Sequence, residues 1–400
     1  MRWRAGGFAA GALLAGLLAG SAVGFYLGAA NPDWLPALGQ APAGRVDQAA
    51  LDQAVRVLQA HYVDQKLDYT KLTRGGIRGM VESLNDPNSE YLDPDQYKRQ
   101  QDSFAGRYTG IGIYVSFRAD YPQITGVVPG SPAEKAGIRT DDVIVKVDGK
   151  DARGLRADQA SAEIQGPEGT RVTLTLRRGA DTFDVGVVRA RIKLPFVLSS
   201  KLEGGVLYLR IFSFGDNSSS ELDSQLASGL PGAKAVVLDL RDDPGGFISS
   251  ADDIISRFLS SGETFELRDR TGTVERHQVS GSHPAAAVPL VVVVNANSAS
   301  ASEIVAGSLQ VHGRARLVGT RTYGKATVQQ DYPLPGGGDL HITIKRWYLP
   351  NGTSVDKRGL QPDVEVALAS SDRMFNVTRP DLGHAADDQL NRALALVTGG

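Results

Sequence analysis

The stretch VVVVNANSASASEIVAGSLQ, residues 291–310, carries the features that decide the fold of this chain. Four consecutive valines are typical of a strand that is buried on both faces, and an amphipathic segment begins at Glu303. We therefore expect a strand, a tight loop with three alternating serines, and a helix. A helix N-terminus presents unpaired backbone N–H groups, so a serine there can attack a carbonyl while neighbouring amides hold the oxyanion. Simple capping also fits, because Ser300-x-x-Glu303 is a capping box.

Continuous apolar runs also precede this stretch and alternate with helical segments. Such runs are typical of a largely parallel sheet covered on both faces, so we predict an α/β domain. Parallel crossovers place functional loops at the carboxyl ends of strands, where residues 241–246 (RDDPGG) and 295–302 both fall. The predicted elements are strands at 206–211, 235–240 and 290–294, helices at 218–230 and 249–261, and a hairpin at 327–346.

The amino-terminal stretch, residues 5–30, is uncharged, rich in alanine, glycine and leucine, and preceded by Arg2 and Arg4. It is long enough to span a bilayer, for which about 20 residues suffice. Basic residues on its amino side favour a cytoplasmic N-terminus and an exported body. A cleavable signal peptide is the alternative, since residues 28–30 offer small side chains for cleavage. We expect an extracytoplasmic protein, anchored to the inner membrane by this segment or secreted after its removal.

Composition narrows the class of protein. Four hundred residues with 42% hydrophobic and 22% charged side chains indicate a globular chain of two or three domains. A net charge of −2 carries no nucleic-acid signature. The absence of cysteine excludes disulfides, thiolate metal sites and a cysteine nucleophile, and the six histidines have no paired metal-ligand spacing. We expect no metal and no nucleic-acid partner.

Residues 46–105 and 106–190 form two further regions. The first has helical patterns at 46–62, 72–84 and 95–104, typical of a packing or dimerisation element. The second begins with Gly110-Ile111-Gly112-Ile113, where glycines at a strand start leave N–H groups free for a carboxylate and the strand edge can accept a peptide.

The motifs "GIGI", "VVPGSPAEKAGI", "DDVIVKVDG" and "GTRVTLTL" occur in the order and spacing of a bacterial PDZ domain, which residues 106–190 resemble. The resemblance implies that the loop from Gly110 to Ile113 binds the C-terminal carboxylate of a peptide through the amides of Ile111, Gly112 and Ile113. Arg171 is either a sensor of the docked peptide or a solvated residue of its strand.

The motifs "LRDDPGG", "VNANSASASEIVAGSLQ", "TYGKATVQ" and "GLQPDV" follow, and the whole chain from Val46 onward resembles the carboxy-terminal processing peptidases, or tail-specific proteases. These are serine endopeptidases with a Ser/Lys dyad. The resemblance implies that Ser300 is the nucleophile, Lys325 the general base and Gln329 the residue that orients the lysine. It implies an oxyanion hole made of the backbone N–H groups of Gly246 and Ala301, and no cofactor.

The residue types suit this chemistry. A neutral lysine can deprotonate serine, but its ordinary pKa is about 10.4, so lowering it to about 7–8 costs on the order of 4 kcal/mol. Desolvation can supply this shift. A carboxylate against Lys325 would oppose it, whereas Gln329 can hold the amine without adding charge.

Three residues depart from the family pattern, which usually has glycine in place of Asn297 and Ala326 and often has aspartate in place of Val311. His312 offers a Ser/His alternative, although a helix C-terminal histidine is the simpler interpretation.

These patterns predict an α/β serine peptidase with a β-rich PDZ domain, inserted or preceding, and a small helical amino-terminal element. We expect it to cleave proteins near accessible C-termini, with the PDZ domain binding the tail and gating activity, and to form a homodimer through its terminal helices. The alternative is a non-catalytic PDZ adaptor or pseudoprotease. The predicted regions are an anchor or signal at 1–30, a linker at 31–45, helices at 46–105, the PDZ domain at 106–190, the peptidase core at 191–370 and a helical tail at 371–400.

Overall fold

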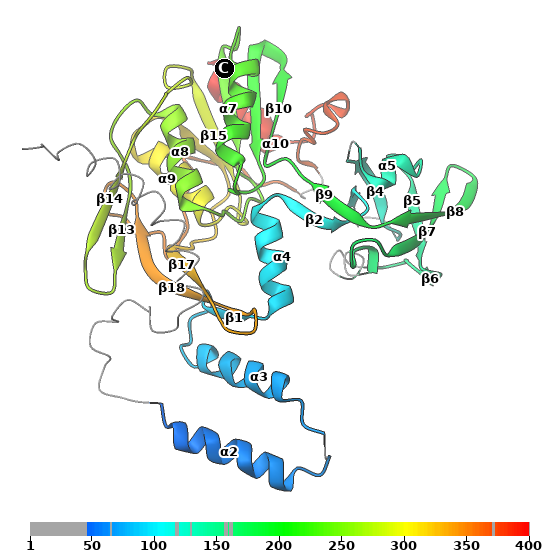
Figure 1. The fold of residues 1–400 in the computed structure, drawn as a ribbon. Helices are drawn as coiled ribbons and strands as arrows, with labels where there is room; N and C mark the ends of the chain where they lie inside the picture. The colour runs from blue at the N-terminus through cyan, green and yellow to red at the C-terminus, as the bar shows by residue number, and fades with distance from the viewer. Residues whose placement is uncertain are drawn as a thin grey trace, which may run out of the picture. The chain divides into compact units, whose positions relative to one another are not determined.

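The computed structural model describes residues 46–64, 66–116, 120–128, 130–155, 159, 163–369 and 373–399 (Figure 1). The predicted membrane segment and the linker at 31–45 lie outside these residues. Within the described ranges, no helix is both long and apolar enough to cross a membrane. The chain divides into two compact units, one that runs to Asp93 and includes Asp331–Leu340, and one made of Pro94–Gln330 and His341–Gly400.

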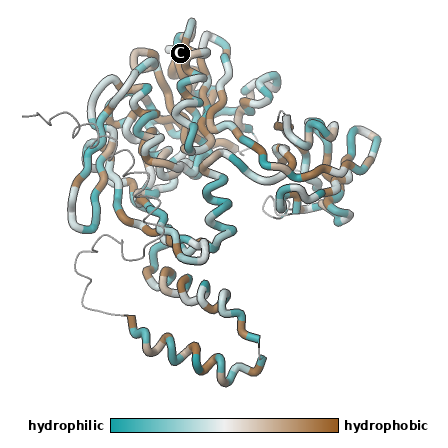
Figure 2. The backbone as a smooth tube through the Cα atoms, in the orientation of Figure 1, coloured by the Kyte–Doolittle hydropathy of each residue, from teal (hydrophilic) through white to brown (hydrophobic). Residues whose placement is uncertain are grey.

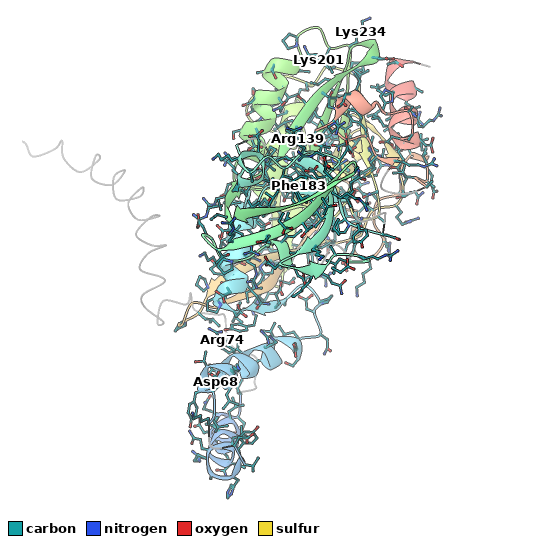
Figure 3. The ribbon with its side chains drawn as sticks, turned by 90° about the vertical axis from the view of Figure 1, so that its right-hand side faces the viewer. Asp68, Arg74, Arg139, Phe183, Lys201 and Lys234 are labelled. Atoms are coloured by element: carbon teal, nitrogen blue, oxygen red, sulfur yellow. The ribbon has the colours of Figure 1, made fainter. Side chains whose placement is uncertain are left out.

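The first unit contains α2 (Gln48–His61), α3 (Tyr69–Glu82) and the short strand β1 (Glu90–Leu92). Each helix starts at an aspartate: Asp47 accepts a hydrogen bond from Ala50 N, and Asp68, labelled in Figure 3, accepts one from Lys71 N. The cap at Asp68 starts α3 three residues before the predicted position. Hydrophobic residues recur along both helices (Figure 2). Several of their side chains, including Leu51, Val55 and Met80, are exposed, and no residue of α2 is buried.

The PDZ domain lies between the two strands of an antiparallel ribbon, β2 (Arg107–Gly110) and β9 (Ala190–Lys193). Its sheet has the order β3-β4-β5-β7-β8, with β6 paired to β5. Apolar side chains that include Ile111, Ile124 and Leu174 fill its core. The elements are β3 (Ile113–Ser116), β4 (Gln123–Val127), α5 (Pro132–Lys135), β5 (Val143–Val147), β6 (Lys150–Asp151), β7 (Arg171–Arg178) and β8 (Asp181–Val188), which carries Phe183 (Figure 3).

The core sheet has the order β10-β11-β12-β15-β16-β19. Strand β10 is antiparallel to β11, and the remaining strands run parallel. The predicted strands at 206–211 and 290–294 are confirmed as β11 (Val206–Ile211) and β15 (Leu290–Val294). The other strands are β10 (Val197–Leu202), β12 (Ala235–Asp239), β16 (Arg316–Gly319) and β19 (Val364–Glu365).

Both faces of this sheet are covered, which explains the continuous apolar runs. Leu207 and Leu209 pack with residues of α7 (Ser218–Gly229), α8 (Ile248–Phe258) and α9 (Ala301–Val311). Val206 and Tyr208 face the other side, where they pack with Phe375 and with α10 (Asp388–Thr398). Figure 2 shows the resulting concentration of hydrophobic residues along the central strands.

A second sheet contains β13 (Glu263–Asp269), β14 (Val274–Gln278), β17 (Thr327–Pro333) and β18 (Asp339–Tyr348), and β1 pairs with β18. The pair β17–β18 confirms the predicted hairpin. The pair β13–β14 was not predicted, because its charged residues hide the strand pattern. Helix α4 (Pro94–Phe104) and 3₁₀ turns at Glu203–Gly205 and Pro380–Leu382 complete the described elements. Lys201, near the carboxyl end of antiparallel β10, and Lys234, just before β12, lie at the end of the sheet where β11 and β12 begin (Figure 3).

Candidate active site

Two loops meet at the carboxyl ends of β12 and β15. Ala299 N donates a hydrogen bond to Asp243 O at 3.0 Å. A Cβ built on Gly245 would lie 2.7 Å from Ala299 O and 2.8 Å from Ala301 N, so only glycine allows the two backbones to approach this closely. The crossover topology therefore joins the RDDPGG and serine loops as predicted from their positions.

Ser300 occupies the sharp turn between β15 and α9. Its φ is 56° and its ψ is −116°, a strained conformation for a residue with a side chain, and α9 begins at the next residue. A strand-to-helix turn of this kind presents a serine hydroxyl at the top of a sheet. The side chain is half-buried.

The two neighbouring serines are buried and serve the loop. Ser298 Oγ accepts a hydrogen bond from Asn295 N at 2.9 Å and donates one to Leu240 O at 2.8 Å. Ser302 Oγ donates to Asp243 O at 3.0 Å. Ser300 is therefore the only one of the three whose side chain reaches the surface of the site.

Glu303 connects the serine loop to the segment that carries Lys325. Its Oε2 accepts hydrogen bonds from Ser300 N and Lys325 N, both at 2.9 Å. Its Oε1 accepts from Thr322 Oγ1 at 2.6 Å and from Gly324 N at 2.8 Å. Burial raises the pKa of this carboxyl, and these four donors counteract the rise. The capping pattern predicted only the contact with Ser300.

Lys325 lies just before β17, and its backbone is held on both sides. Its N–H donates to Glu303, and its carbonyl accepts from Trp347 Nε1 at 3.0 Å. Gln329 follows on β17, where its Nε2 donates to Thr327 Oγ1 at 2.9 Å and to Thr343 Oγ1 at 3.0 Å. These bonds orient the amide of Gln329 and leave its oxygen as the acceptor that the predicted role requires.

The predicted oxyanion-hole donors belong to the same two loops. Gly246 has a φ of 146° and forms a bridge with Phe214, in which Phe214 N donates to Gly245 O and Phe247 N donates to Phe214 O. Ala301 is the first residue of α9, where a helix leaves N–H groups unpaired. Among the described residues, neither the Gly246 nor the Ala301 N–H has a hydrogen-bond partner. Both remain available for a developing oxyanion.

A buried ionic network supports the RDDPGG loop from behind. Arg241 is fully buried and donates to Asp239, and also to Asp387 through two hydrogen bonds of 2.9 and 2.8 Å. Burial alone would raise the pKa of Asp239, but the charges of Arg241 and Arg210 outweigh it and lower the pKa to about 2. Asp387 is the N-cap of α10, so the network ties the C-terminal helix to this loop.

Asp243 is a second buried carboxyl within the loop. Its Oδ1 accepts from Gly245 N at 2.8 Å, whereas Oδ2 has no hydrogen-bond partner among the described residues. Burial raises the pKa of this carboxyl well above its ordinary value, and the N–H of Gly245 counteracts part of the rise.

The GIGI loop of the PDZ domain is anchored through its carbonyls. Ile111 O accepts from Ala133 N at 2.8 Å and Gly112 O accepts from Val128 N at 2.9 Å. Gly112 has a φ of 87°, and a Cβ there would lie 2.3 Å from the Cβ of Ser131. Backbone and packing both require glycine at this position.

Two candidates lie away from these sites. Arg171 is exposed, and its guanidinium covers Gly186 on the adjacent strand β8. This placement favours the solvated-strand interpretation over a sensor. His312 is the C-cap of α9, at the opposite end of an 11-residue helix from Ser300, and its Nε2 contacts Glu263 O. A Ser/His pair is therefore ruled out.

Comparison with known proteins agrees with this geometry. Peptidase family S41 matches residues 205–366, a PDZ domain matches 123–178, and the activating protease CtpB N-terminal domain matches 39–96. A probable CtpA-like serine protease of Staphylococcus aureus (strain MSSA476) is 35% identical over 353 residues, which cover 87% of this chain and 71% of the relative. The chain belongs to peptidase family S41.

Further similarities place this S41 peptidase among named processing enzymes. A carboxy-terminal-processing protease of Bartonella bacilliformis is 38% identical over 321 residues, covering 78% of this chain and 74% of the relative. The solved photosystem II D1 C-terminal processing protease is 26% identical with a TM-score of 0.50, covering 81% of this chain and 94% of that one. A putative S41 protease from Bacteroides fragilis shares the fold, with a TM-score of 0.60 at 18% identity and coverage of 90% and 99%.

Sequence reasoning missed three functional features of this S41 peptidase. They are the second contact of Glu303, the burial of Asp243 and the link from Asp387 to Arg241, and all three depend on tertiary packing. The sequence contained one local indication of these features, the charged residues 241–243 close to two glycines. Charged residues that become buried near a turn need partners, which indicates a loop held by ion pairs.

Proposed function

We propose that this S41 peptidase is a serine endopeptidase that cleaves proteins at or near their C-termini, with Ser300 as nucleophile and Lys325 as general base. The observation that carries the proposal is the Glu303 carboxylate, whose Oε2 binds the backbone N–H groups of both residues at 2.9 Å. One carboxylate oxygen thereby holds the backbones of the two residues beside each other.

The reaction follows from this arrangement. Neutral Lys325 removes the proton from Ser300 Oγ as the oxygen attacks the substrate carbonyl. The carbonyl oxygen becomes negatively charged and accepts hydrogen bonds from Gly246 N and Ala301 N. The lysine ammonium then protonates the leaving amine, and an acyl-enzyme forms. Water, deprotonated by Lys325, hydrolyses the ester and regenerates Ser300. Gln329 orients the lysine amine through its amide oxygen.

The PDZ loop at Gly110–Ile113 serves as the docking site for the substrate C-terminus, so the substrates are proteins with an accessible tail. Relatives named for carboxy-terminal processing support this assignment. Gating of activity by the docked tail belongs to the same proposal, with Arg171 retained as a sensor candidate only.

The location and assembly are also proposals. The apolar segment at 5–30 would anchor the protein to the inner membrane, with the body outside the cytoplasm. The exposed apolar side chains of α2 and α3 support a homodimer through these helices. Protease accessibility in spheroplasts and light scattering of the purified chain test these two points.

The activity is tested by incubation with casein, a disordered protein, beside Ser300→Ala and Lys325→Ala variants. Wild type should generate fragments, and both variants should lose this activity while they keep the same melting temperature. Lys325→Arg is a matched control that keeps a long basic side chain but cannot act as a base near neutral pH, so it should be inactive as well. Equal cleavage by wild type and both alanine variants, with tail peptides present, would leave the non-catalytic PDZ adaptor as the better description.

A further inference from the structure

Asn297 and Asp242 connect the two catalytic loops through their side chains. Asp242 follows β12 and Asn297 follows β15, and the two residues lie 55 positions apart in the chain. Asn297 Nδ2 donates a hydrogen bond to Asp242 Oδ1 at 2.8 Å. Asn297 is exposed and Asp242 is partly buried. This contact involves two side chains to which the proposed reaction assigns no role.

Asn295 completes the contact, and we call the side chains of Asp242, Asn295 and Asn297 the Asp–Asn clasp. Asn295 Nδ2 donates to Asp242 Oδ1 at 2.8 Å. Asn295 Oδ1 accepts from Asp242 N at 3.0 Å and from Asn297 N at 3.1 Å. Asp242 has a φ of 57°, a left-handed conformation that a short polar side chain tolerates. The clasp therefore fixes this turn of the RDDPGG loop against the start of the serine loop.

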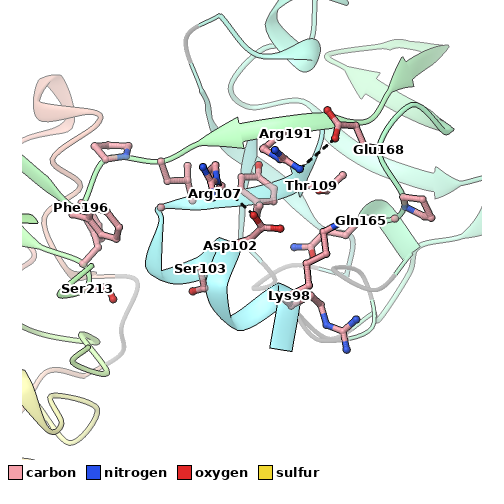
Figure 4. Close-up of a pocket in the computed structure, with 18 of the residues that line it drawn as sticks. Lys98, Asp102, Ser103, Arg107, Thr109, Gln165, Glu168, Arg191, Phe196 and Ser213 are labelled. Carbon is pink, nitrogen blue, oxygen red and sulfur yellow. Dashed lines mark ion pairs between the residues drawn. The ribbon is translucent and has the colours of Figure 1, made fainter. Parts of the chain in front are cut away.

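The rest of the RDDPGG loop is held by other hydrogen bonds. Two donors of the serine loop bind Asp243 O, both at 3.0 Å. Ser213 Oγ donates to Gly245 O at 2.9 Å, and Ser213 is one of the residues that line a cavity of about 1010 Å³ (Figure 4). The loop is thus fixed from Asp243 onward without the clasp, and the clasp adds the contact at Asp242.

The strained turn at Ser300 is supported on both sides. A residue with a φ of 56° and a ψ of −116° keeps this conformation only when its surroundings impose it. Glu303, three residues after Ser300, binds Ser300 N at 2.9 Å. Asn297, three residues before Ser300, is bound by Asp242. The clasp therefore supports the side of the turn that Glu303 does not reach.

We propose that Asn297 is a positioning residue that, through Asp242, keeps the Ser300 turn aligned with the oxyanion-hole donors. The family pattern usually has glycine at this position, and glycine has no side chain that could reach Asp242. Misalignment of reacting groups slows the chemical step, whereas the proposed docking of the tail at the PDZ loop does not involve Asn297. Loss of the clasp should therefore lower kcat and leave KM unchanged. The inference rests on the proposed function.

The test measures initial rates of cleavage of fluorescently labelled casein by the full chain over a range of casein concentrations, which gives kcat and KM separately. Asn297→Ala removes the donating amide. Asp242→Gly removes the acceptor and suits the left-handed backbone. The double variant completes a double-mutant cycle. Asn351→Ala is the matched control, because Asn351 is an exposed asparagine whose Oδ1 accepts from Thr353 N within its own turn.

Asn297→Ala should lower kcat about tenfold with KM unchanged. Asp242→Gly should lower kcat at least as much, since it also releases Asn295, and the double variant should be no slower than Asp242→Gly. Labelling of Ser300 by a fluorophosphonate probe should slow to the same degree in Asn297→Ala, which reports on the serine without casein. The melting temperature of Asn297→Ala should match that of Asn351→Ala, since both substitutions are at the surface.

Three results would overturn the positioning role and leave the proposed function intact. They are cleavage by Asn297→Ala within about twofold of Asn351→Ala, a rise in KM with unchanged kcat, and additive effects of the two substitutions in the double variant. If Ser300→Ala cleaves casein as fast as wild type, the proposed function is itself wrong and the positioning role falls with it.

Discussion

Glu303→Gln tests whether a single carboxylate aligns the nucleophile and the base. In wild type, Oε2 accepts from Ser300 N and Lys325 N, and Oε1 accepts from Thr322 Oγ1 and Gly324 N. Glutamine keeps the shape of the side chain but replaces one oxygen with an NH₂ group. Whichever oxygen the NH₂ group replaces, it then faces hydrogen-bond donors from which it cannot accept.

The less costly orientation places the NH₂ toward Thr322, whose hydroxyl can accept a hydrogen bond. Gly324 N then loses its acceptor, and an unpaired buried donor costs about 1–3 kcal/mol. Ser300 N and Lys325 N exchange a charged acceptor for a neutral one, which weakens each bond by about 1 kcal/mol. Removal of a buried carboxylate whose pKa burial has raised offsets part of this loss. We expect a net loss in the free energy of unfolding of about 1–3 kcal/mol.

The effect on catalysis should exceed the effect on stability, because the weakened bonds position both reacting groups. A displacement of about 1 Å between catalytic groups lowers the rate about 100-fold. We therefore expect kcat/KM of Glu303→Gln for a tail peptide to fall about 100-fold. Its affinity for the same peptide, measured by fluorescence anisotropy in a protein that also carries Ser300→Ala, should be unchanged. Exposed Glu203→Gln is the matched control. Activity of Glu303→Gln within threefold of Glu203→Gln, in a folded protein, would refute the bridging role.

Four substitutions distinguish residues that support the site from the residue that reacts. Ser302→Ala removes a buried hydrogen bond, so it should lower the free energy of unfolding in urea by about 1–2 kcal/mol but retain cleavage. Ser300→Ala should abolish cleavage with little change in stability. The opposite pattern would reassign the nucleophile. Burial raises the pKa of Asp243 in the folded state above the value of about 4 for an unfolded aspartate, so wild-type stability should decline as pH rises from about 4 through the raised folded pKa. Asp243→Asn should remove that decline in urea titrations across pH, and an identical slope in both proteins would contradict the assignment. Asp387→Ala leaves buried Arg241 with one partner fewer and should cost about 3–5 kcal/mol in the same assay, whereas a loss below about 1 kcal/mol would show that the C-terminal helix does not support the loop.

Local sequence patterns predicted most of the secondary structure and the chemically distinctive residues. The valine run at 291–294 is apolar throughout because both faces of its strand are covered, so its burial is visible in the sequence itself. Resemblance to a known motif singled out Ser300 and Lys325. The strands β13 and β14 escaped prediction because charged side chains interrupt their alternation.

The tertiary structure decided which of these residues can act together. Three serines share one motif, but only Ser300 reaches the surface, because the hydroxyls of its neighbours are bonded to the loop after β12. Arg241 and Asp387 are 146 residues apart, and a sheet with helices on both faces brings them together. Glu303, which the sequence indicated only as a capping residue, also binds Lys325 N, because the same fold brings these two segments together. The sequence by itself determined the identity of the reacting groups, since local spacing encodes a strand, a turn and a helix start. Their alignment depends on hydrogen bonds between loops that only the crossovers of the parallel sheet place side by side.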